Sequence, residues 1–308
     1  MNKSTKESIL VTCCIPSYNH SNYVRHAILS VIEQTYGNIE LIIIDDGSKD
    51  KSIDQIERMR TLCEDRFSNF VFINRENRGL SATLNEMISI ANGEFVTILA
   101  SDDSYMPNKI ELLTNRLNQL PNDYAAIFGD AEIIYNNDLK DKGCKSFITR
   151  YLYNNNIDSS FDVTYKDILQ GNFIPAMSIL YRKDAIKSVG GFRESLRLED
   201  WDMYLRLLHS FKIRGCTTAV AYYYLHGENS IFKDNYKLLK DTIEILKAEK
   251  VFSFSIGLEN IWFRKYYDTL ISILRKEKKI SYITPYLNNA TFTSIISYFI
   301  KKIIKRFN

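Results

Sequence analysis

The chain lacks the features that identify several common classes of protein. Its 308 residues carry a formal net charge of only +3, so no basic excess indicates a nucleic-acid partner. No apolar run approaches the ~18 residues that a membrane-spanning helix needs. The first eight residues, Met-Asn-Lys-Ser-Thr-Lys-Glu-Ser, contain no apolar stretch, and we therefore expect no signal peptide.

Cysteine is scarce and is not arranged for metal binding. The five cysteines are odd in number, and their spacing matches no zinc motif; they are Cys13, Cys14, Cys63, Cys144 and Cys216. This pattern predicts reduced thiols in a cytosolic protein, some of them core residues.

Two nucleotide-binding signatures are also missing. No Gly-x-Gly-x-x-Gly follows the first predicted strand, and no Gly-Lys-Ser/Thr loop occurs anywhere. Their absence argues against a dinucleotide-binding Rossmann domain and against a P-loop nucleotide hydrolase.

The first 130 residues alternate between strand-like and helix-like patterns. With 45% hydrophobic residues, the chain can bury a full core. Short apolar runs predict five strands, at residues 9–15, 40–44, 70–73, 95–99 and 125–128. Helical spacing of apolar residues fills the intervals, at about 23–32, 51–63, 80–91 and 110–120. This alternation predicts a mostly parallel sheet with helices on its faces.

The pattern changes after Asp130. Residues 136–160 are polar and rich in asparagine, which predicts a loop. Strands are predicted at 173–181 and 219–225, a tight turn at Gly190-Gly191-Phe192, and a helix at 198–209. From residue 235 onward the pattern is helical.

The last stretch has a helical pattern of its own. Eight apolar residues repeat at helical spacing, namely Phe292, Ile295, Ile296, Phe299, Ile300, Ile303, Ile304 and Phe307, while most basic residues fall on the other side. Such a basic amphipathic helix can lie in an anionic membrane surface, or it can pack on its own domain with its lysines in water. The sequence leaves both readings open.

Pairs of carboxylates follow two of the predicted strands. Asp45-Asp46 come after residues 40–44, and Asp102-Asp103 come after residues 95–99. The carboxyl ends of strands in an α/β sheet are where ligands bind. Hard oxygen ligands there suit Mg²⁺ or Mn²⁺ carrying a phosphate. The alternative for each pair taken alone is a solvated turn.

Four segments together resemble the family 2 glycosyltransferases, which are inverting enzymes that use nucleotide sugars. The segments are Ile15-Pro16-Ser17-Tyr18-Asn19, Asp45-Asp46-Gly47-Ser48, Asn77-Arg78-Gly79-Leu80 through Ala100-Ser101-Asp102-Asp103, and Leu198-Glu199-Asp200-Trp201-Asp202. The resemblance covers roughly residues 8–230 and implies the GT-A fold.

The resemblance also implies a domain organisation. We expect a catalytic domain at 1–230, with a nucleotide-sugar-binding half at about 1–130 and an acceptor-binding half at about 131–230. A helical C-terminal region at 231–308 follows, whose basic helix can either associate with a membrane or pack on its own domain.

By this resemblance, Asp103 should coordinate a divalent metal, Mn²⁺ or Mg²⁺, that bridges the diphosphate. Asp102 should lie beside the ribose or the sugar, and His226 resembles a late histidine that joins the metal or the diphosphate. The commoner family pattern has an aspartate at the position of Ala100. This departure removes one carboxylate, and because a subset of the family shares the shortened form, we interpret it as a variant of the motif.

Five further residues should bind the donor nucleotide. Asp46 should accept a hydrogen bond from the base, which suits N3–H of uracil. Tyr18, with Pro16 before it, should pack on the base, and Asn19 should line the same pocket. Arg78 should reach the base or the phosphates, although an exposed loop arginine is the alternative.

The segment around Asp200 should carry the catalytic base. Glycosyl transfer requires an acceptor hydroxyl to be deprotonated, and a positioned carboxylate can act as general base. Asp200 is our candidate, and Asp202 is its rival, expected to serve structure. Glu199, Trp201 and Gly191 are expected on the acceptor side.

The implied function is transfer of a sugar from a nucleotide sugar, most simply a UDP-sugar, to a hydroxyl of an acceptor glycan. The acceptor would be lipid-linked or part of a bacterial surface polysaccharide such as O-antigen, capsule or lipooligosaccharide. Cytoplasmic localisation, peripheral at the inner face of the cell membrane, would follow. A sugar nucleotidyltransferase and a non-catalytic nucleotide-sugar-binding module are the alternatives. The first would need a glycine-rich triphosphate loop where this chain has Pro-Ser-Tyr-Asn.

Overall fold

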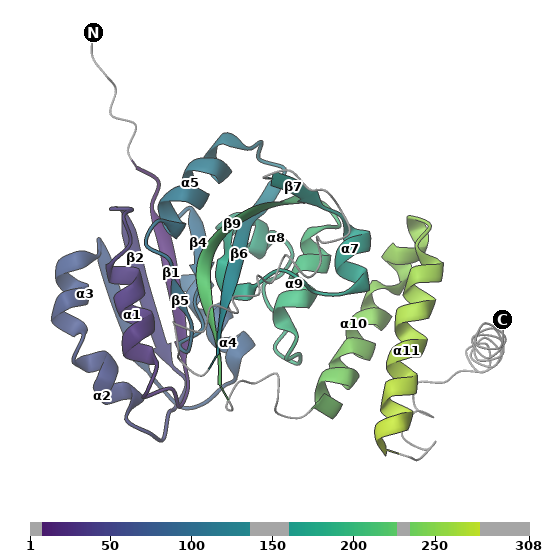
Figure 1. Cartoon of the computed structure of the whole chain (residues 1–308), viewed down its shortest axis with the longest axis horizontal. Coiled ribbons are helices and arrows are strands. Elements are labelled where there is room, and N and C mark those ends of the chain that lie inside the picture. The colour runs from purple at the N-terminus through teal and green to yellow at the C-terminus, as the bar shows by residue number, and fades with distance from the viewer. Residues whose placement is uncertain (1–7, 136–159, 227–234, 278–308) are drawn as a thin grey trace, which may run out of the picture. The chain divides into compact units, whose positions relative to one another are not determined.

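The computed structural model describes residues 8–135, 160–226 and 235–277. The chain divides into two compact units, residues 1–229 and residues 230–308. Figure 1 shows the elements along the chain.

The first unit begins with four parallel strands and the helices that connect them. The strands are β1 (Val11–Ser17), β2 (Ile39–Asp45), β3 (Asn69–Asn74) and β4 (Phe95–Ile98). The helices are α1 (Val24–Ile32), α2 (Ser52–Glu57), α3 (Arg60–Arg66), α4 (Leu80–Ile90) and α5 (Lys109–Gln119). In the sheet the strands lie in the order β3-β2-β1-β4, so each carboxyl end lies on the same edge.

The sheet continues with strands of mixed direction. These are β5 (Ser104–Tyr105), β6 (Tyr124–Tyr135), β7 (Ser160–Val163), β8 (Ile179–Arg182) and β9 (Lys212–Leu225). The order beyond β4 is β8-β6-β9-β5, and β7 pairs with β9. Antiparallel pairing of β4 with β8 ends the parallel half. The remaining elements of this unit are α7 (Tyr165–Gln170), a 3₁₀ turn (Ala176–Ser178), α8 (Lys183–Ser188) and α9 (Glu199–Leu207).

The core lies on both faces of the parallel half, as the near-continuous apolar strands predict. Alternate residues of β1, such as Val11 and Cys13, pack in one buried cluster with residues of α1, α2, α3 and α5. Helix α4 covers the opposite face of the sheet, where Met87 is fully buried. The architecture expected from the sequence, a sheet flanked by helices with a helical C-terminal region, is confirmed.

Several predicted boundaries were wrong. Pro16 does not stop β1, because β4 pairs only with Val11–Cys14 and the missing N–H of Pro16 lies beyond that pairing. The helix predicted at 51–63 is two helices, since Met59 N–H bonds to the oxygen of Ile56 only three residues back.

The later half differs more from the predicted elements. The strand predicted at 173–181 begins only at Ile179, because Ser178 turns back onto the carbonyl oxygen of Pro175. Strand β9 is longer than predicted, and the sequence did not indicate β5, β7, α7 or α8. The predicted loop at 136–160 lies outside the described residues except for Ser160.

In the second unit the structure describes residues 235–277, where α10 (Asn235–Ser255) and α11 (Glu259–Glu277) are joined by a turn in which Gly257 has φ +75°. The indole N–H of Trp262 donates to the carbonyl oxygen of Leu246, and its ring stacks on Tyr266 at 4.7 Å. Among the described helices, none combines the length and apolarity required to traverse a lipid bilayer. The predicted basic amphipathic helix lies outside the described residues.

A fully buried lysine sits at the start of α5. The ammonium of Lys109 donates to the hydroxyl of Thr97 and lies 3.4 Å from the ring centroid of Tyr105. Among the described residues, no carboxylate pairs with it. Burial lowers the pKa of Lys109 well below its usual value, and the neighbouring Cys13 only partly opposes this.

Replacement of this lysine by methionine should therefore stabilise the protein. At neutral pH the unfolded chain carries a charged Lys109 that folding must neutralise or bury, at a free-energy cost. We expect Lys109→Met to raise the free energy of unfolding by about 1–4 kcal/mol. Because the folded state binds this proton less tightly, wild-type stability should rise with pH toward 10.5, and the advantage of Lys109→Met should shrink. Urea unfolding at pH 7 and pH 9.5 measures both effects; a variant less stable than wild type at pH 7 would contradict the prediction.

Candidate active site

The candidate site is built on the carboxyl ends of β2, β1 and β4. Ser17 pairs with Asp45 at the end of β1 and β2, and Cys14 pairs with Ile98 at the end of β4. The N–H of Asp46 continues the ladder by donating to the carbonyl oxygen of Ser17. The segments that follow the three strands are thus neighbours, as the sequence predicted from their parallel order.

Asp45 organises the loops after β1 and β2. Its buried carboxylate accepts from the hydroxyl groups of Ser17 and Ser48 and from the N–H of Ser48 at 2.7 Å. The Ser48 hydroxyl accepts in turn from the N–H of Asn19. Gly47 makes this turn possible, since it has φ +78° and an added Cβ would lie 2.9 Å from the backbone nitrogen of Asn77.

Asn19 and Tyr18, two predicted nucleotide contacts, occupy different environments. Asn19 adopts φ +55°, and its side-chain oxygen accepts from the N–H of Lys49, so it joins the β1 and β2 loops. Tyr18 is 48% exposed, which leaves its ring available for stacking. Pro16 lies within β1. The nucleotide roles of these three residues remain predictions.

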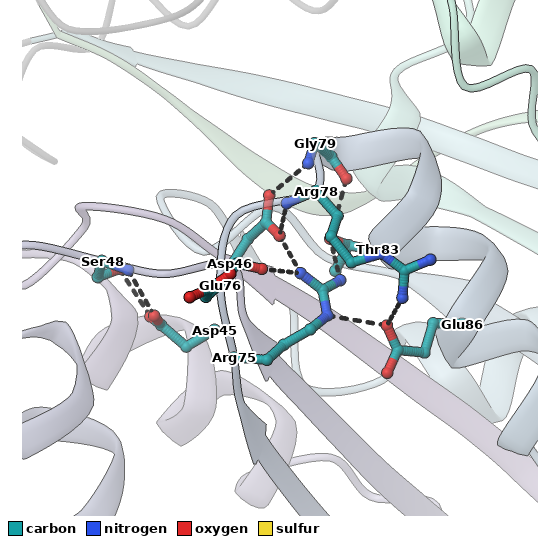
Figure 2. A network of polar contacts seen from close by, with 9 residues as sticks. All are labelled: Asp45, Asp46, Ser48, Arg75, Glu76, Arg78, Gly79, Thr83 and Glu86. Atoms are coloured by element: carbon teal, nitrogen blue, oxygen red, sulfur yellow. Dashed lines mark hydrogen bonds and ion pairs between the residues drawn. The ribbon is translucent and has the colours of Figure 1, made fainter.

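Asp46 is held by a polar network that the sequence analysis did not anticipate (Figure 2). One carboxylate oxygen accepts from the N–H of Arg78 at 2.8 Å, and the other from the N–H of Gly79 at 2.9 Å. The guanidinium of Arg75 also donates to Asp46. Although burial alone would raise it, these hydrogen bonds from Arg78, Arg75 and Gly79 lower the pKa of Asp46. Asp46 is thus an ionised group that joins β2 to the start of α4, and its contact with a base remains a prediction.

Arg78 joins this network mainly through its backbone N–H. Its side chain is 56% exposed and makes a 3.4 Å contact with Glu86. The predicted contact with a nucleotide therefore requires no buried bond to be broken.

Asp102 lies between two histidines. Nε2 of His226 is 3.2 Å from Oδ2 of Asp102, and Nε2 of His20 is 3.8 Å from the same oxygen. Nδ1 of His20 contacts the hydroxyl of Ser101 at 2.8 Å, and the ring of His226 stacks on Tyr23 at 4.4 Å. His226, predicted from the resemblance, is therefore brought to the carboxylate pair. His20 and Tyr23 were missed; the available signal was their position in the segment that joins the carboxyl end of β1 to α1.

Asp103 is the more buried member of the pair. It is 2% exposed and accepts from the N–H of Tyr224 at 3.1 Å. Burial, together with the neighbouring negative charge of Asp102, raises the pKa of Asp103 well above its usual value. The tight turn that presents it closes between the N–H of Asp103 and the carbonyl oxygen of Ala100.

This donor set fits a divalent cation bound together with a ligand. Two adjacent carboxylates repel each other when both are ionised, and a cation between them and a diphosphate would remove that cost. No group of three or more His, Cys, Asp or Glu side chains within the described ranges is arranged to hold an ion alone. Oxygens of the diphosphate would therefore have to complete the coordination shell.

Asp200, the predicted base, lies in the first turn of α9 and is partly exposed. One carboxylate oxygen accepts from the side-chain amide of Asn172 at 2.8 Å, and the other from the N–H of Trp201 at 2.6 Å. Loss of hydration raises the pKa of Asp200, and the bonds from Trp201 and Asn172 only partly oppose this. A carboxylate with a raised pKa has the property that a general base requires.

The neighbouring carboxylate, Asp202, forms ion pairs with two arginines. Its side chain is buried and accepts at 2.8 Å from Arg206 and at 2.9 Å from Arg193. Arg206 also donates to the carbonyl oxygens of Val189 and Gly191. These contacts agree with the structural role expected for Asp202.

The three residues predicted on the acceptor side differ in burial and in their contacts. Trp201 is buried, and its indole N–H donates to the carbonyl oxygen of Ile168 at 2.7 Å. Gly191 has φ +71°, and an added Cβ would lie 2.7 Å from the side-chain oxygen of Asn85. Glu199 is half-buried at the start of α9. Backbone geometry and packing account for Gly191 and Trp201, and an acceptor contact remains a prediction for all three.

Helix α4 connects the Asp46 network with the segment that precedes Asp200. Gly79, just before its first turn, donates to Asp46, and Thr83 accepts from Arg75. On the same helix, Asn85 bonds to the backbone of Phe192 and Ser81 donates to the carbonyl oxygen of Leu196. Helix α4 thus contacts both the Asp46 network and the segment that leads to Asp200.

Comparison with known proteins identifies the family. Residues 12–190, more than half of the chain, match the family described as Glycosyl transferase family 2. The chain belongs to glycosyltransferase family 2. An uncharacterized glycosyltransferase, RT0329 of Rickettsia typhi, is 34% identical over 208 residues, which are 67% of this chain and 61% of that protein. The chain thus spans less than two thirds of that relative's length.

A relative whose name states a specific activity is more distant. It is named UDP-Glc:alpha-D-GlcNAc-diphosphoundecaprenol beta-1,3-glucosyltransferase WfgD, from Escherichia coli, and is 25% identical over 78% of this chain and 86% of its own length.

Two solved structures share the fold of this family 2 chain. TarS residues 1–349 of S. aureus, in complex with UDP-GlcNAc, superposes with a TM-score of 0.65 at 18% identity, over 85% of this chain and 72% of that 1–349 chain. The mannosyltransferase PcManGT of Pyrobaculum calidifontis, in complex with GDP-Man and Mn²⁺, gives 0.57 at 16% identity, over 97% and 87%. At these identities the likeness establishes the GT-A fold and nothing finer.

Proposed function

We propose that this protein is an inverting hexosyltransferase that moves a sugar from a nucleotide sugar to a hydroxyl of an acceptor glycan. The observation that carries the proposal is the position of Asp102, Asp103 and His226 on the sheet edge that also carries Asp46. The partly exposed Asp200, whose pKa is raised, would supply the general base that such a reaction also requires.

The donor half would hold the diphosphate and the nucleotide. Asp103 and His226, with Asp102 beside them, would hold Mn²⁺ or Mg²⁺, which neutralises the leaving diphosphate when bound. Asp46 would accept a hydrogen bond from the base, with Tyr18 stacked on it and Pro16 and Asn19 lining the pocket. Arg78 would reach the base or the phosphates.

The acceptor half would activate the attacking hydroxyl. Ionised Asp200 would take the proton from this hydroxyl while its oxygen attacks the anomeric carbon on the face opposite the diphosphate. One such displacement inverts the anomeric centre. Glu199, Trp201 and Gly191 would shape the acceptor side.

A UDP-sugar is the donor we propose. The name of WfgD contains a UDP-glucose donor, and TarS was solved with UDP-GlcNAc. PcManGT was solved with GDP-Man, so a GDP-sugar is the competing donor. Hydrolysis of a panel of UDP-, GDP- and TDP-sugars with Mn²⁺ tests this: turnover of a UDP-sugar above the others supports the proposal, and preference for another base contradicts it.

A lipid-linked glycan is the acceptor we propose, in bacterial surface polysaccharide synthesis such as that of O-antigen, capsule or lipooligosaccharide. The name of WfgD contains a diphosphoundecaprenol-linked acceptor. The enzyme would act in the cytoplasm at the inner membrane face, with the basic residues near 301–306 contacting anionic lipid. Cosedimentation with anionic vesicles tests this location, and a full chain that stays in solution would contradict it.

The second candidate function is a non-catalytic nucleotide-sugar-binding module. The alanine at position 100, where the commoner pattern has an aspartate, favours it. Turnover of any nucleotide sugar in the panel would exclude this candidate.

Asp103→Asn should separate metal binding from stability. The amide oxygen can still accept from the N–H of Tyr224, so the fold should survive, and the cost of a buried charge disappears. We expect Mn²⁺-dependent UDP affinity to fall by at least ~10-fold, while the melting temperature without metal is unchanged or higher. Calorimetry of UDP binding with and without Mn²⁺ measures this, and equal affinity in the variant would remove Asp103 from the metal site.

A further inference from the structure

Arg75 is the central residue of the polar network in Figure 2. It lies directly after β3, and its side chain is 16% exposed. Its Nε donates to Glu86 at 2.9 Å, one terminal nitrogen donates to Asp46 and to the carbonyl oxygen of Glu76, and the other donates to the hydroxyl of Thr83 at 2.8 Å. Every nitrogen of the guanidinium is therefore engaged.

We propose that Arg75 is a positioning residue for the nucleotide end of the donor site, acting by fixing the carboxylate of Asp46. The inference rests on the proposed function, because it assumes that a nucleotide binds at the tip of β2.

The contacts of Asp46 explain why one arginine has this effect. From one side Asp46 is held by the N–H groups of Arg78 and Gly79, which belong to the loop entering α4. From another side it is held by Arg75, which is itself anchored to Thr83 and Glu86 on α4. The tip of β2, the loop after β3 and the first two turns of α4 thus form one connected unit. Without Arg75, the side chain of Asp46 would be held by the loop alone.

The charge balance points the same way. Asp46 and Glu86 are two carboxylates that share Arg75, and Glu86 also faces Arg78 at 3.4 Å. Removing Arg75 leaves one excess negative charge beside the proposed binding place of a nucleoside diphosphate, which is itself an anion. The variant should therefore weaken donor binding both by loosening Asp46 and by repulsion.

A lysine cannot replace this arginine. The partners lie in different directions around the planar guanidinium, and only its fork can donate to Asp46, Thr83 and Glu86 together. An ammonium keeps the positive charge but loses this geometry. Arg75→Lys therefore separates the effect of charge from the effect of positioning.

The test compares four full-length proteins by calorimetry with UDP in the presence of Mn²⁺. These are wild type, Arg75→Met, Arg75→Lys and the control Arg60→Met. Arg60, the first residue of α3, makes an exposed two-pronged ion pair with Glu57 at the end of α2. Its loss removes the same kind of bond at a site away from Asp46. We expect UDP affinity to fall about 10-fold in Arg75→Met, the loss typical of a charge-assisted hydrogen bond. Arg75→Lys should lose part of the affinity, and Arg60→Met should bind as wild type.

Kinetics provide the readout that a merely structural role would not change. In Arg75→Met the KM for the donor should rise about as much as the affinity falls, while kcat stays within about twofold of wild type. A lower melting temperature with unchanged UDP affinity and KM would overturn the proposal. So would wild-type affinity in Arg75→Lys, which also serves if Arg75→Met does not fold. Failure of wild type to bind any nucleoside diphosphate would instead overturn the proposed function, and the two failures are distinguishable.

Discussion

Asp200→Asn should reduce turnover by at least ~10²-fold, the loss usual for a general base, while UDP binding is retained. Asparagine has nearly the shape of aspartate, and its amide oxygen can still accept from the N–H of Trp201. The variant should therefore fold normally but lack the group that takes the acceptor proton. Steady-state kinetics with the active donor, together with calorimetry of UDP, measure the two quantities separately.

The pH profile supplies the control for Asp200. Loss of hydration raises the pKa of this carboxyl, so its ionised, active form should disappear at a pH above the ordinary aspartate value of 3.8. Wild-type kcat/KM should therefore fall as the pH decreases through that raised pKa, and the residual activity of Asp200→Asn should lack this step. Unchanged turnover in the variant would mean that another residue acts as the general base.

Asp202→Ala should have the largest effect on stability. Removal of this carboxylate leaves Arg206, which is buried, and Arg193 without their shared partner. Breaking a buried ion pair by deleting one partner costs about 3–5 kcal/mol. The turn at Gly191 should be affected as well, because Arg206 donates to the carbonyl oxygens of Val189 and Gly191. Urea unfolding followed by tryptophan fluorescence measures the loss.

Glu57→Ala is the matched control for Asp202. It also removes the acidic partner of an arginine on a helix, but the pair with Arg60 is exposed to solvent. Water screens such pairs, and we expect a much smaller change in stability. Equal losses in the two variants would show that burial of Asp202 is not the cause.

The parallel half of the fold could be predicted from the sequence because its signals are local. The apolar run ending in Asp45 is buried along its whole length, as a strand covered on both faces must be. The later half was less predictable. Strand β5 has only two residues, and β8 pairs antiparallel with both β4 and β6. Such pairings depend on partners far away in the chain, and no local pattern encodes them.

The candidate site divides in the same way. The sequence alone pointed to the candidate residues, namely Asp46, Asp102, Asp103, Asp200 and His226, because strand ends and the family-like motifs are properties of short segments. Their roles in the chemistry remain predictions. Tertiary structure decided their partners. It placed His20 and His226 beside Asp102. It also paired Asp202 with two arginines, and it bonded Asp46 to Arg75 and to the N–H groups at the start of α4. Those contacts join residues from separate elements, up to 124 positions apart, and they form only when the sheet brings its loops to one edge.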